Sequence, residues 1–254
     1  MRVISVAAQK GGVGKSTTAH ALGHGLILKG YTVLFIDLDP QGNLSHTIAA
    51  EEDGATMYDL LMREVTALDA IQHAGGGDII PANESLSAAD IELTKTGKEY
   101  RLKEALQSIA DRYDYAIIDT PPSLGILTVN ALTASDILIA PSQADMYCLK
   151  AMWHLHGTID AVKKYCNPSL VIAGILLTRH NGRAVLSQDM ADLLKDIAEQ
   201  IGTKVFNTTI REGIAVREAQ ARQQDIYSYA PKSNAAADYM AFVNELLDGG
   251  VNHG

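Results

Sequence analysis

The sequence predicts an α/β fold in which a doubly wound, mostly parallel twisted sheet is flanked by helices on both faces. Apolar segments of strand length alternate with segments of helical periodicity along the 254 residues. A glycine-rich turn joins the first strand to the first helix, and aspartates follow two later apolar strands. Ligands of open parallel sheets bind at the carboxyl ends of the strands, so we expect these features to share one edge.

The predicted elements follow one another from the N-terminus onward. Predicted strands cover residues 2–8, 32–37, 78–81, 115–119, 136–140, 170–177 and 204–208. Predicted helices lie near residues 16–29, 56–62, 99–111, 125–134, 146–165, 184–200, 212–220 and 233–248. The least regular region is 41–98, which we expect to decorate the rim of the sheet. No repeat or linker divides the chain, so we expect a single domain over residues 1–254.

The most specific motif is the run Lys-Gly-Gly-Val-Gly-Lys-Ser-Thr at residues 10–17. It resembles the phosphate-binding pattern G-x-x-x-x-G-K-[ST], with Gln9 in place of the first glycine and a second lysine, Lys10. Backbone N–H groups of such a loop converge on phosphate oxygens at a helix N-terminus. The expected phosphate site comprises Lys10, Gly11, Gly12, Val13, Gly14, Lys15, Ser16 and Thr17. We expect Lys15 to contact the β- and γ-phosphates and the Ser16 hydroxyl to hold Mg²⁺. The alternative, a tight turn that binds nothing, is disfavoured because strand, loop and helix occur together.

Two apolar strands run into aspartates. Asp37 and Asp39 end the segment Val-Leu-Phe-Ile-Asp-Leu-Asp at residues 33–39, and Asp119 ends Tyr-Ala-Ile-Ile-Asp at 115–119. The second segment matches a Walker B strand, whose aspartate holds Mg²⁺. A turn or capping aspartate before Pro121 is the alternative for Asp119. Ser16 and Asp119 are therefore the metal ligands that the motifs themselves predict.

Composition narrows the class of protein. The net charge is −9, with 47% hydrophobic and 20% charged residues, as in globular proteins. No apolar run reaches the length of about 18 residues that a membrane helix needs. The first strand leaves no room for a signal peptide, so we expect a cytoplasmic protein. Cys148 and Cys166 are expected to be ordinary reduced cysteines rather than a disulfide or metal site.

These motifs together resemble the deviant Walker ATPases, and most of all their ParA/Soj branch, which partitions plasmids and chromosomes. The resemblance rests on residues 10–16, on 37–43, which read Asp-Leu-Asp-Pro-Gln-Gly-Asn, and on 119–122, which read Asp-Thr-Pro-Pro. It implies ATP and Mg²⁺ as cofactors, slow ATP hydrolysis and an ATP-dependent homodimer. In that dimer Lys10 is expected to reach the partner's phosphates, as an arginine finger does. A solvated surface lysine is the alternative.

The resemblance also implies roles for individual residues. The catalytic group would comprise Lys10, Lys15, Asp37 and Asp39. Asp39 would orient the attacking water. Asp37 would support the Mg²⁺ shell, which makes Ser16, Asp37 and Asp119 the expected metal site, although Asp37 could instead be the residue that positions the water. The segments 37–43 and 119–125 would sense the γ-phosphate. Adenine would lie near Thr178 and Arg211.

The distribution of charged residues along the chain indicates where the protein could bind DNA. Residues 1–149 carry 10 Lys/Arg against 19 Asp/Glu, whereas residues 150–232 carry 11 against 8. The family places its non-specific surface for double-stranded DNA in the second segment, where phosphate contacts would be sequence-independent and salt-sensitive. The candidates are Arg183, Lys195, Lys204, Arg211, Arg217, Arg222 and Lys232. A normally solvated face is the alternative. Many relatives carry arginine near position 215, where this chain has alanine. Arg217, two residues further on, could take the place of that arginine.

Other functions of related ATPases fit the sequence less well. A membrane-cycling ATPase of the MinD type needs a basic amphipathic C-terminal helix, but residues 244–254 are acidic and then glycine-rich. A relative that carries a metal cluster needs cysteines positioned to share it across a dimer. Some ParA relatives position protein clusters instead of DNA. We expect no helix-turn-helix extension, no membrane binding, a ParB-type partner that stimulates hydrolysis, and location on the nucleoid.

Overall fold

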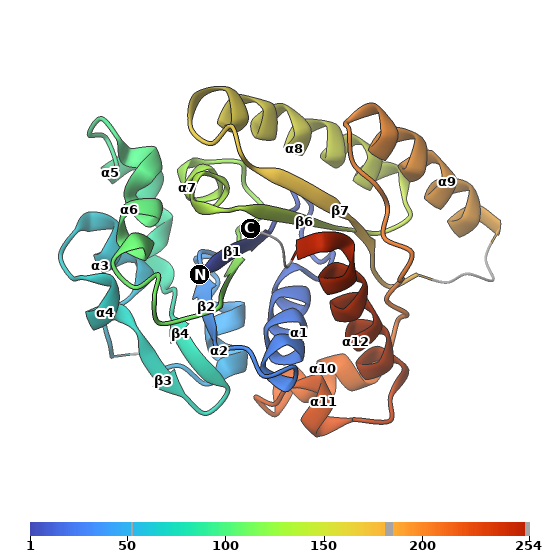
Figure 1. Cartoon of the computed structure of the whole chain (residues 1–254), viewed down its shortest axis with the longest axis horizontal. Coiled ribbons are helices and arrows are strands. Elements are labelled where there is room, and N and C mark those ends of the chain that lie inside the picture. The colour runs from blue at the N-terminus through green and yellow to red at the C-terminus, as the bar shows by residue number, and fades with distance from the viewer. Residues whose placement is uncertain (52, 181–184, 252–254) are drawn as a thin grey trace.

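The computed structural model describes residues 1–51, 53–180 and 185–251. Within them one sheet of seven strands has the order β3-β4-β2-β5-β1-β6-β7. All neighbouring strands pair in parallel except β3 and β4, which are antiparallel. Helices cover both faces, as Figure 1 shows with α7 and α8 above the sheet and α1 and α12 below it. The predicted doubly wound α/β fold is confirmed.

The elements have the following bounds. The strands are β1 (Arg2–Val6), β2 (Val33–Asp37), β3 (Gln72–Ala74), β4 (Gly77–Ile80), β5 (Tyr115–Asp119), β6 (Ile137–Ser142) and β7 (Val171–Leu177). The longer helices are α1 (Lys15–Leu28), α6 (Arg101–Gln107), α7 (Ile126–Ala134), α8 (Met146–Tyr165), α9 (Val185–Gln200), α10 (Ile214–Ala221) and α12 (Asn234–Leu246). The shorter helices are α2 (Asn43–Ile48), α3 (Met57–Met62), α4 (Ala67–Ala70), α5 (Ala89–Glu92) and α11 (Ile226–Tyr229). Two 3₁₀ turns, η1 (Glu84–Ala88) and η2 (Lys98–Tyr100), and a π-helical turn, η3 (Leu247–Val251), complete the description.

Alternating side chains of the strands form two apolar layers, as the two-residue period of a strand requires. Ile4, Phe35 and Ile117 point to one face and pack with α1 and α12. Leu34 and Ile118 point to the other face and pack with α3, α6 and α7. Both faces of the central strands are therefore buried, which explains their almost continuous apolar sequences.

Two differences from the predicted elements have physical causes. The predicted strand at 204–208 is wrong, because only Val205 forms a bridge, with Ile175 of β7. The Glu245 carboxylate of α12 instead accepts hydrogen bonds from the backbone N–H groups of Asn207 and Thr208, at 2.7 and 2.8 Å. The region 41–98 also holds more structure than expected, namely the short strand β3 and the short helices α2, α4 and α5, whereas α3 matches the helix predicted at 56–62.

Two further expectations concern cysteines and membranes. Cys148 and Cys166 are both free, and most of α8 lies between them, about 27 Å along a helix axis. A disulfide between them within one chain is therefore impossible. In the described part of the chain, no helix combines the length and apolar character needed to cross a bilayer.

A buried histidine pair in α1 makes stability depend on pH. His20 is buried with its ring 4.5 Å from that of His24. Burial, with His24 adding to it, lowers the pKa of His20 to about 3 from its usual 6.5. Between these pH values the unfolded chain binds a proton that the folded chain does not. The His20 contribution to the free energy of unfolding should fall by about 2 kcal/mol from pH 7 to pH 5.

A matched variant isolates this effect. Burial raises the pKa of Asp37 to about 6. Asp37 therefore increases the free energy of unfolding as pH falls, which opposes the effect of His20 in the wild-type protein. His20→Leu keeps an apolar side chain of similar size and leaves Asp37 in place. Urea unfolding of both proteins at pH 5, 6 and 7 should show the variant gaining about 2 kcal/mol relative to wild type as pH falls. A constant difference between the two proteins would contradict the assignment.

Candidate functional site

The phosphate loop lies between β1 and α1 and faces a cavity of about 480 Å³ at the carboxyl edge of the sheet. Gly12 and Gly14 have φ of 75° and 87°, a left-handed conformation that side chains with a Cβ rarely adopt. Gly14 is the N-cap residue of α1, so the first N–H groups of that helix are directed to the cavity. The cavity is lined by Gly11, Gly12, Gly14, Lys15, Ser16, Thr17, Asp39, Gln41, Asn43, His46, Thr47, Pro122, Arg179, Gln220 and Ala221.

Lys15 and Asp119 form the charged floor of this site. Burial lowers the pKa of Lys15, and the Asp119 and Asp39 carboxylates partly oppose that shift. Asp119 is completely buried, and neither carboxylate oxygen has a hydrogen-bond partner among the described residues. Ser16 lies near enough to lower the pKa of Asp119, but burial and repulsion from Asp37 dominate and raise it well above its usual range.

These groups fit a magnesium ion. An orphaned buried carboxylate is costly unless a cation or donor satisfies it, and Mg²⁺ prefers hard oxygen ligands. Asp119 supplies such oxygens beside the Ser16 hydroxyl, at the edge where the phosphates would lie. The donor set thus agrees with the predicted metal residues Ser16 and Asp119.

Asp37 and Asp39 occupy different environments. Asp37 is fully buried, and its Oδ1 accepts from the Asp39 N–H at 3.0 Å. Its Oδ2 accepts from both the N–H and the hydroxyl of Ser45, each at 2.8 Å. Asp39 lines the cavity, and its Oδ1 accepts from the Gln41 N–H at 3.0 Å. The geometry therefore gives Asp37 a structural task in anchoring α2 and leaves Asp39 facing the nucleotide site.

The residues expected near adenine lie beside a second, smaller cavity. It is lined by Gly14, Thr17, Thr178, Arg179, Ile210, Arg211, Glu212, Gly213, Val216, Arg217, Gln220 and Tyr239. The Thr178 hydroxyl donates to the Val13 carbonyl at 2.7 Å, so it supports the phosphate loop from below. The Arg211 guanidinium pairs with both carboxylate oxygens of Asp238, at 2.9 and 2.6 Å. Both side chains are thus already engaged, and nucleotide contacts from these stretches would come largely from backbone atoms.

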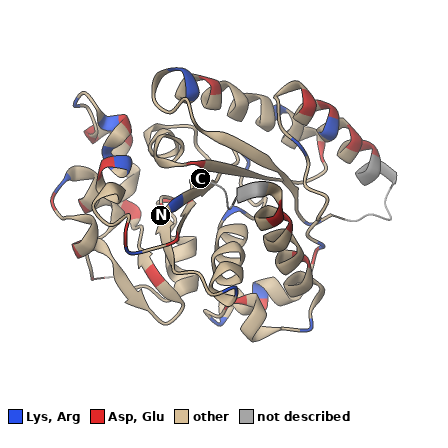
Figure 2. Ribbon diagram, viewed as in Figure 1, with Lys and Arg blue, Asp and Glu red and all other residues tan. Residues whose placement is uncertain are grey.

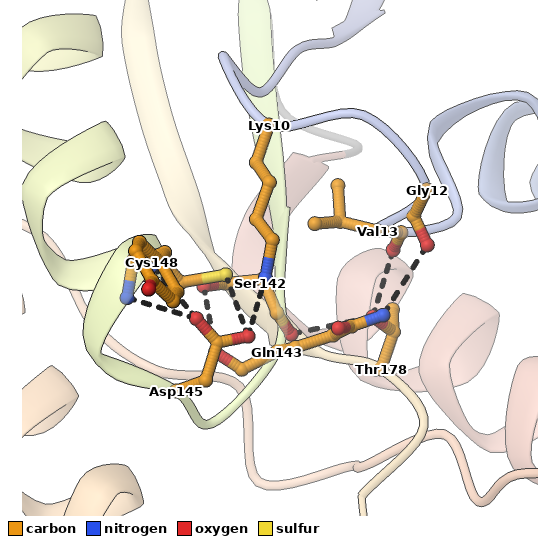
Figure 3. Close-up of polar contacts among 9 residues, drawn as sticks. Lys10, Gly12, Val13, Ser142, Gln143, Asp145, Cys148 and Thr178 are labelled. Atoms are coloured by element: carbon orange, nitrogen blue, oxygen red, sulfur yellow. Dashed lines mark hydrogen bonds and ion pairs between the residues drawn. The ribbon is translucent and has the colours of Figure 1, made fainter.

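Lys10 does not line the nucleotide cavity of its own chain. Its ammonium group lies 2.5 Å from Oδ2 of Asp145, at the start of α8, and 6.0 Å from the centre of the Tyr147 ring (Figure 3). Burial alone would lower the pKa of Lys10, but Asp145 and Cys148 outweigh it and raise the pKa. The two lysines of the loop therefore point to different sites, Lys15 into the cavity and Lys10 away from it.

The basic residues predicted to bind DNA do not form one patch in the chain. Arg217, Arg222 and Lys232 are exposed on and around α10 and α11. Lys195 lies on α9, which packs on the α8 face of the sheet and lies away from α10 and α11 in Figures 1 and 2, and it pairs with Asp192 at 2.8 Å. Lys204 packs over the Phe206 ring, near the amino ends of the strands. The Arg211 charge is met by Asp238. Arg183 lies outside the described residues.

Sequence reasoning missed several residues that connect the site to its surroundings. Gln220 of α10 donates to the Thr17 hydroxyl at 3.0 Å, and Gln223 donates to the His46 carbonyl of α2 at 2.9 Å. Gln143 donates to the Gly12 carbonyl at 3.2 Å. These hydrogen bonds join residues more than a hundred positions apart, and isolated glutamines give no local signal of them.

Comparisons with known proteins agree with this geometry. A family model described as an AAA domain matches residues 1–172. The sporulation initiation inhibitor protein Soj of Bacillus subtilis is 37% identical over 98% of this chain and 99% of its own length. The chromosome partitioning protein ParA of Caulobacter vibrioides is 39% identical over 97% and 94%.

A solved structure extends the comparison to bound ligands. Cobyrinic acid a,c-diamide synthase from Mycobacterium smegmatis, with bound ATP analogue and magnesium, is 32% identical. The match covers 100% of this chain and 97% of that one, with a TM-score of 0.86. Full-length relatives, a shared fold and the phosphate loop lead to the same assignment. The chain belongs to the ParA/Soj family of P-loop ATPases, in the ParA/MinD superfamily.

Proposed function

We propose that this ATPase forms a homodimer on binding ATP and Mg²⁺, and that the dimer binds double-stranded DNA without sequence preference to segregate plasmid or chromosomal DNA. The observation that carries the DNA part is the position of α10. This helix presents Arg217 to solvent, while its Gln220 contacts Thr17 at the nucleotide cavity. The exposed side chains of Arg217 and Arg222, together called the basic surface, are thus attached directly to the ATP site.

Each residue of the site has a separate role in ATP hydrolysis. The phosphate loop and Lys15 hold the phosphates, and Ser16 and Asp119 hold the metal. Bound Mg²⁺ supplies positive charge that stabilises the phosphoryl oxygens. Asp39 orients the attacking water, because its carboxylate faces the cavity while that of Asp37 is fully hydrogen-bonded. Lys10, directed away from its own cavity, supplies a cation to the partner's phosphates.

The nucleotide controls the basic surface through two hydrogen bonds. Gln220 connects α10 to Thr17, the last residue of the phosphate-loop motif. Gln223, just beyond α10, connects to His46 in α2, the helix that follows the Asp37–Asp39 segment. A shift of either segment on binding the γ-phosphate therefore moves α10 and the side chains of Arg217 and Arg222. Duplication of this surface by dimerisation then raises the affinity for DNA by multivalency.

The comparisons favour DNA partition over another use of the same fold. The relative named as a chromosome partitioning protein is 39% identical, whereas the diamide synthase is 32% identical. We assign the chain to the cytoplasm and the nucleoid, as one ATPase domain over residues 1–254. A ParB-type partner stimulates its hydrolysis and releases it from DNA.

ATP-dependent binding to random-sequence DNA tests the proposal. With a labelled duplex at low salt, ATP with Mg²⁺ should increase affinity at least about tenfold over ADP, because only the ATP dimer presents two basic surfaces. Affinity should fall linearly on a log–log plot against salt concentration. Fluorescence anisotropy measures both effects. Equal binding with ATP and ADP would contradict the proposal, and ATP-dependent binding to anionic vesicles instead of DNA would assign the surface to membranes.

A pair of arginine variants locates the surface. Arg217→Ala should weaken binding to all sequences alike and reduce the salt slope by about one for each phosphate that the protein no longer neutralises. Arg112→Ala is the matched control, because Arg112 is also exposed but follows α6 near the amino ends of the strands. Lys195→Ala reports whether α9 contributes. Equal effects of the Arg217 and Arg112 variants would remove α10 from the DNA surface.

A further inference from the structure

We propose that Asp145 is a positioning residue that holds Lys10 against its own chain until a second protomer takes the lysine over. The contact is the ion pair between Lys10 Nζ and Asp145 Oδ2 at 2.5 Å (Figure 3). It rests on the proposed role of Lys10 in the partner's site. Asp145 then sets the ATP and protein concentrations at which the dimer forms.

The two oxygens of Asp145 have separate tasks. Oδ1 accepts hydrogen bonds from the N–H groups of Tyr147 and Cys148, at 2.9 and 3.0 Å, and so caps α8. Oδ2 accepts from Lys10 and lies 3.6 Å from the Cys148 sulfur. Because capping fixes the carboxylate, the pair is preorganised on the Asp145 side. Only the lysine must lose side-chain freedom to form it.

The surroundings show that this ion pair is part of a larger support for the phosphate loop. The segment before α8 also contacts the loop through Gln143, which donates to the Gly12 carbonyl at 3.2 Å. Thr178 of the neighbouring strand end donates to the Val13 carbonyl. Cys148 packs with Ala8 and Val13. Lys10 is thus the charged end of a contact area that fixes both arms of the loop (Figure 3).

The pair is strong enough to hold Lys10 and weak enough to release it. The two side chains are 30% and 33% exposed, so water screens the attraction. Partly exposed pairs change an equilibrium by up to about fivefold. A dimer must break two such pairs, one in each protomer, so their effects multiply. Without the pair, the dissociation constant of the ATP-bound dimer should fall by about tenfold.

The first test examines the pair in the nucleotide-free protein and does not depend on dimerisation. Asp145→Asn keeps an oxygen for the α8 cap but replaces Oδ2 with a donor, and Asp145→Ser also keeps a capping oxygen. Reductive methylation followed by mass spectrometry measures the reactivity of Lys10, with exposed Lys29 as internal reference. Both variants should label Lys10 severalfold faster than wild type. Unchanged labelling in both would overturn the inference.

The second test measures dimerisation by sedimentation velocity in ATP and Mg²⁺. Asp145→Asn and Asp145→Ser should dimerise at about tenfold lower protein concentration. Asp225→Asn is the matched control, because Asp225 caps α11 with the same two-hydrogen-bond geometry. It should dimerise like wild type. Lys10→Ala should have the opposite effect to the Asp145 variants: it should bind ATP but remain monomeric.

The outcomes separate this inference from the proposed function. If wild type dimerises and Lys10→Ala does not, yet both Asp145 variants match wild type, the holding role of Asp145 is wrong and the trans role of Lys10 stands. If wild type and Lys10→Ala dimerise equally with ATP, the trans role itself is wrong, and with it the inference. Faster labelling combined with weaker dimers would also overturn it, because Asp145 would then assist the dimer rather than restrain Lys10.

Discussion

Lys15→Ala should abolish ATP binding at micromolar nucleotide. Lys15 is buried beside Asp39 and Asp119, so its ammonium group is the local positive charge that offsets two carboxylates. Its hydrogen bonds to phosphate oxygens are charge-assisted and contribute about 1.5–3 kcal/mol each. Loss of two such bonds weakens binding by about 10²–10⁴-fold. Repulsion between the triphosphate and the now uncompensated aspartates adds to the loss. Isothermal titration calorimetry with ATP and Mg²⁺ measures it.

A variant in the same helix controls for folding. Lys29 caps the C-terminal end of α1 and is exposed, so Lys29→Ala removes the same charge from that end. It should bind ATP like wild type. Thermal unfolding of both variants shows whether the Lys15 site is still folded. Wild-type ATP affinity in a folded Lys15→Ala protein would mean that the loop glycines alone hold the nucleotide.

Features encoded locally in the sequence were predictable. The loop glycines, Lys15 and Ser16 stand in one short run, and Asp37 and Asp119 each end an apolar strand. Parallel strands bring these ends to one edge whatever the strand order, because all of them run in the same direction, and ligands of such sheets bind at that edge. This is why the site could be outlined before the order of the strands was known.

Features that depend on distant contacts were not predictable. Lys10 and Asp145 are 135 residues apart, and nothing near Asp145 marks it as more than a helix cap. The segment 204–208 has the composition of a strand, but the N–H groups of Asn207 and Thr208 donate to the Glu245 carboxylate of α12 instead of to a neighbouring strand. The basic excess of residues 150–232 is real in the sequence, yet folding places Lys195 on α9 and Arg217 on α10, and these helices pack on opposite faces of the sheet. Net charge along a segment does not reveal such a division.

Asp39→Ala should bind ATP but hydrolyse it at least about a hundredfold more slowly, and so accumulate the ATP-bound dimer. The reason is that Asp39 faces the cavity and its removal takes away the group that orients water, an effect of about 10²–10⁴ in rate. The phosphate loop and Lys15 remain in place, so binding persists. Phosphate release assays measure the rate, and sedimentation in ATP shows the dimer.

Asp37→Ala distinguishes the role of Asp37 from that of Asp39, because the two aspartates have different hydrogen-bond partners and different access to the cavity. Asp37 accepts three hydrogen bonds that fix Asp39 and the start of α2. Its loss leaves buried donors unsatisfied, at about 1–3 kcal/mol, so it should lower the melting temperature together with the rate. Asp39→Ala should lower the rate while the melting temperature stays near that of wild type. If instead Asp39→Ala turns over normally and Asp37→Ala is stable but inactive, the water-positioning role belongs to Asp37.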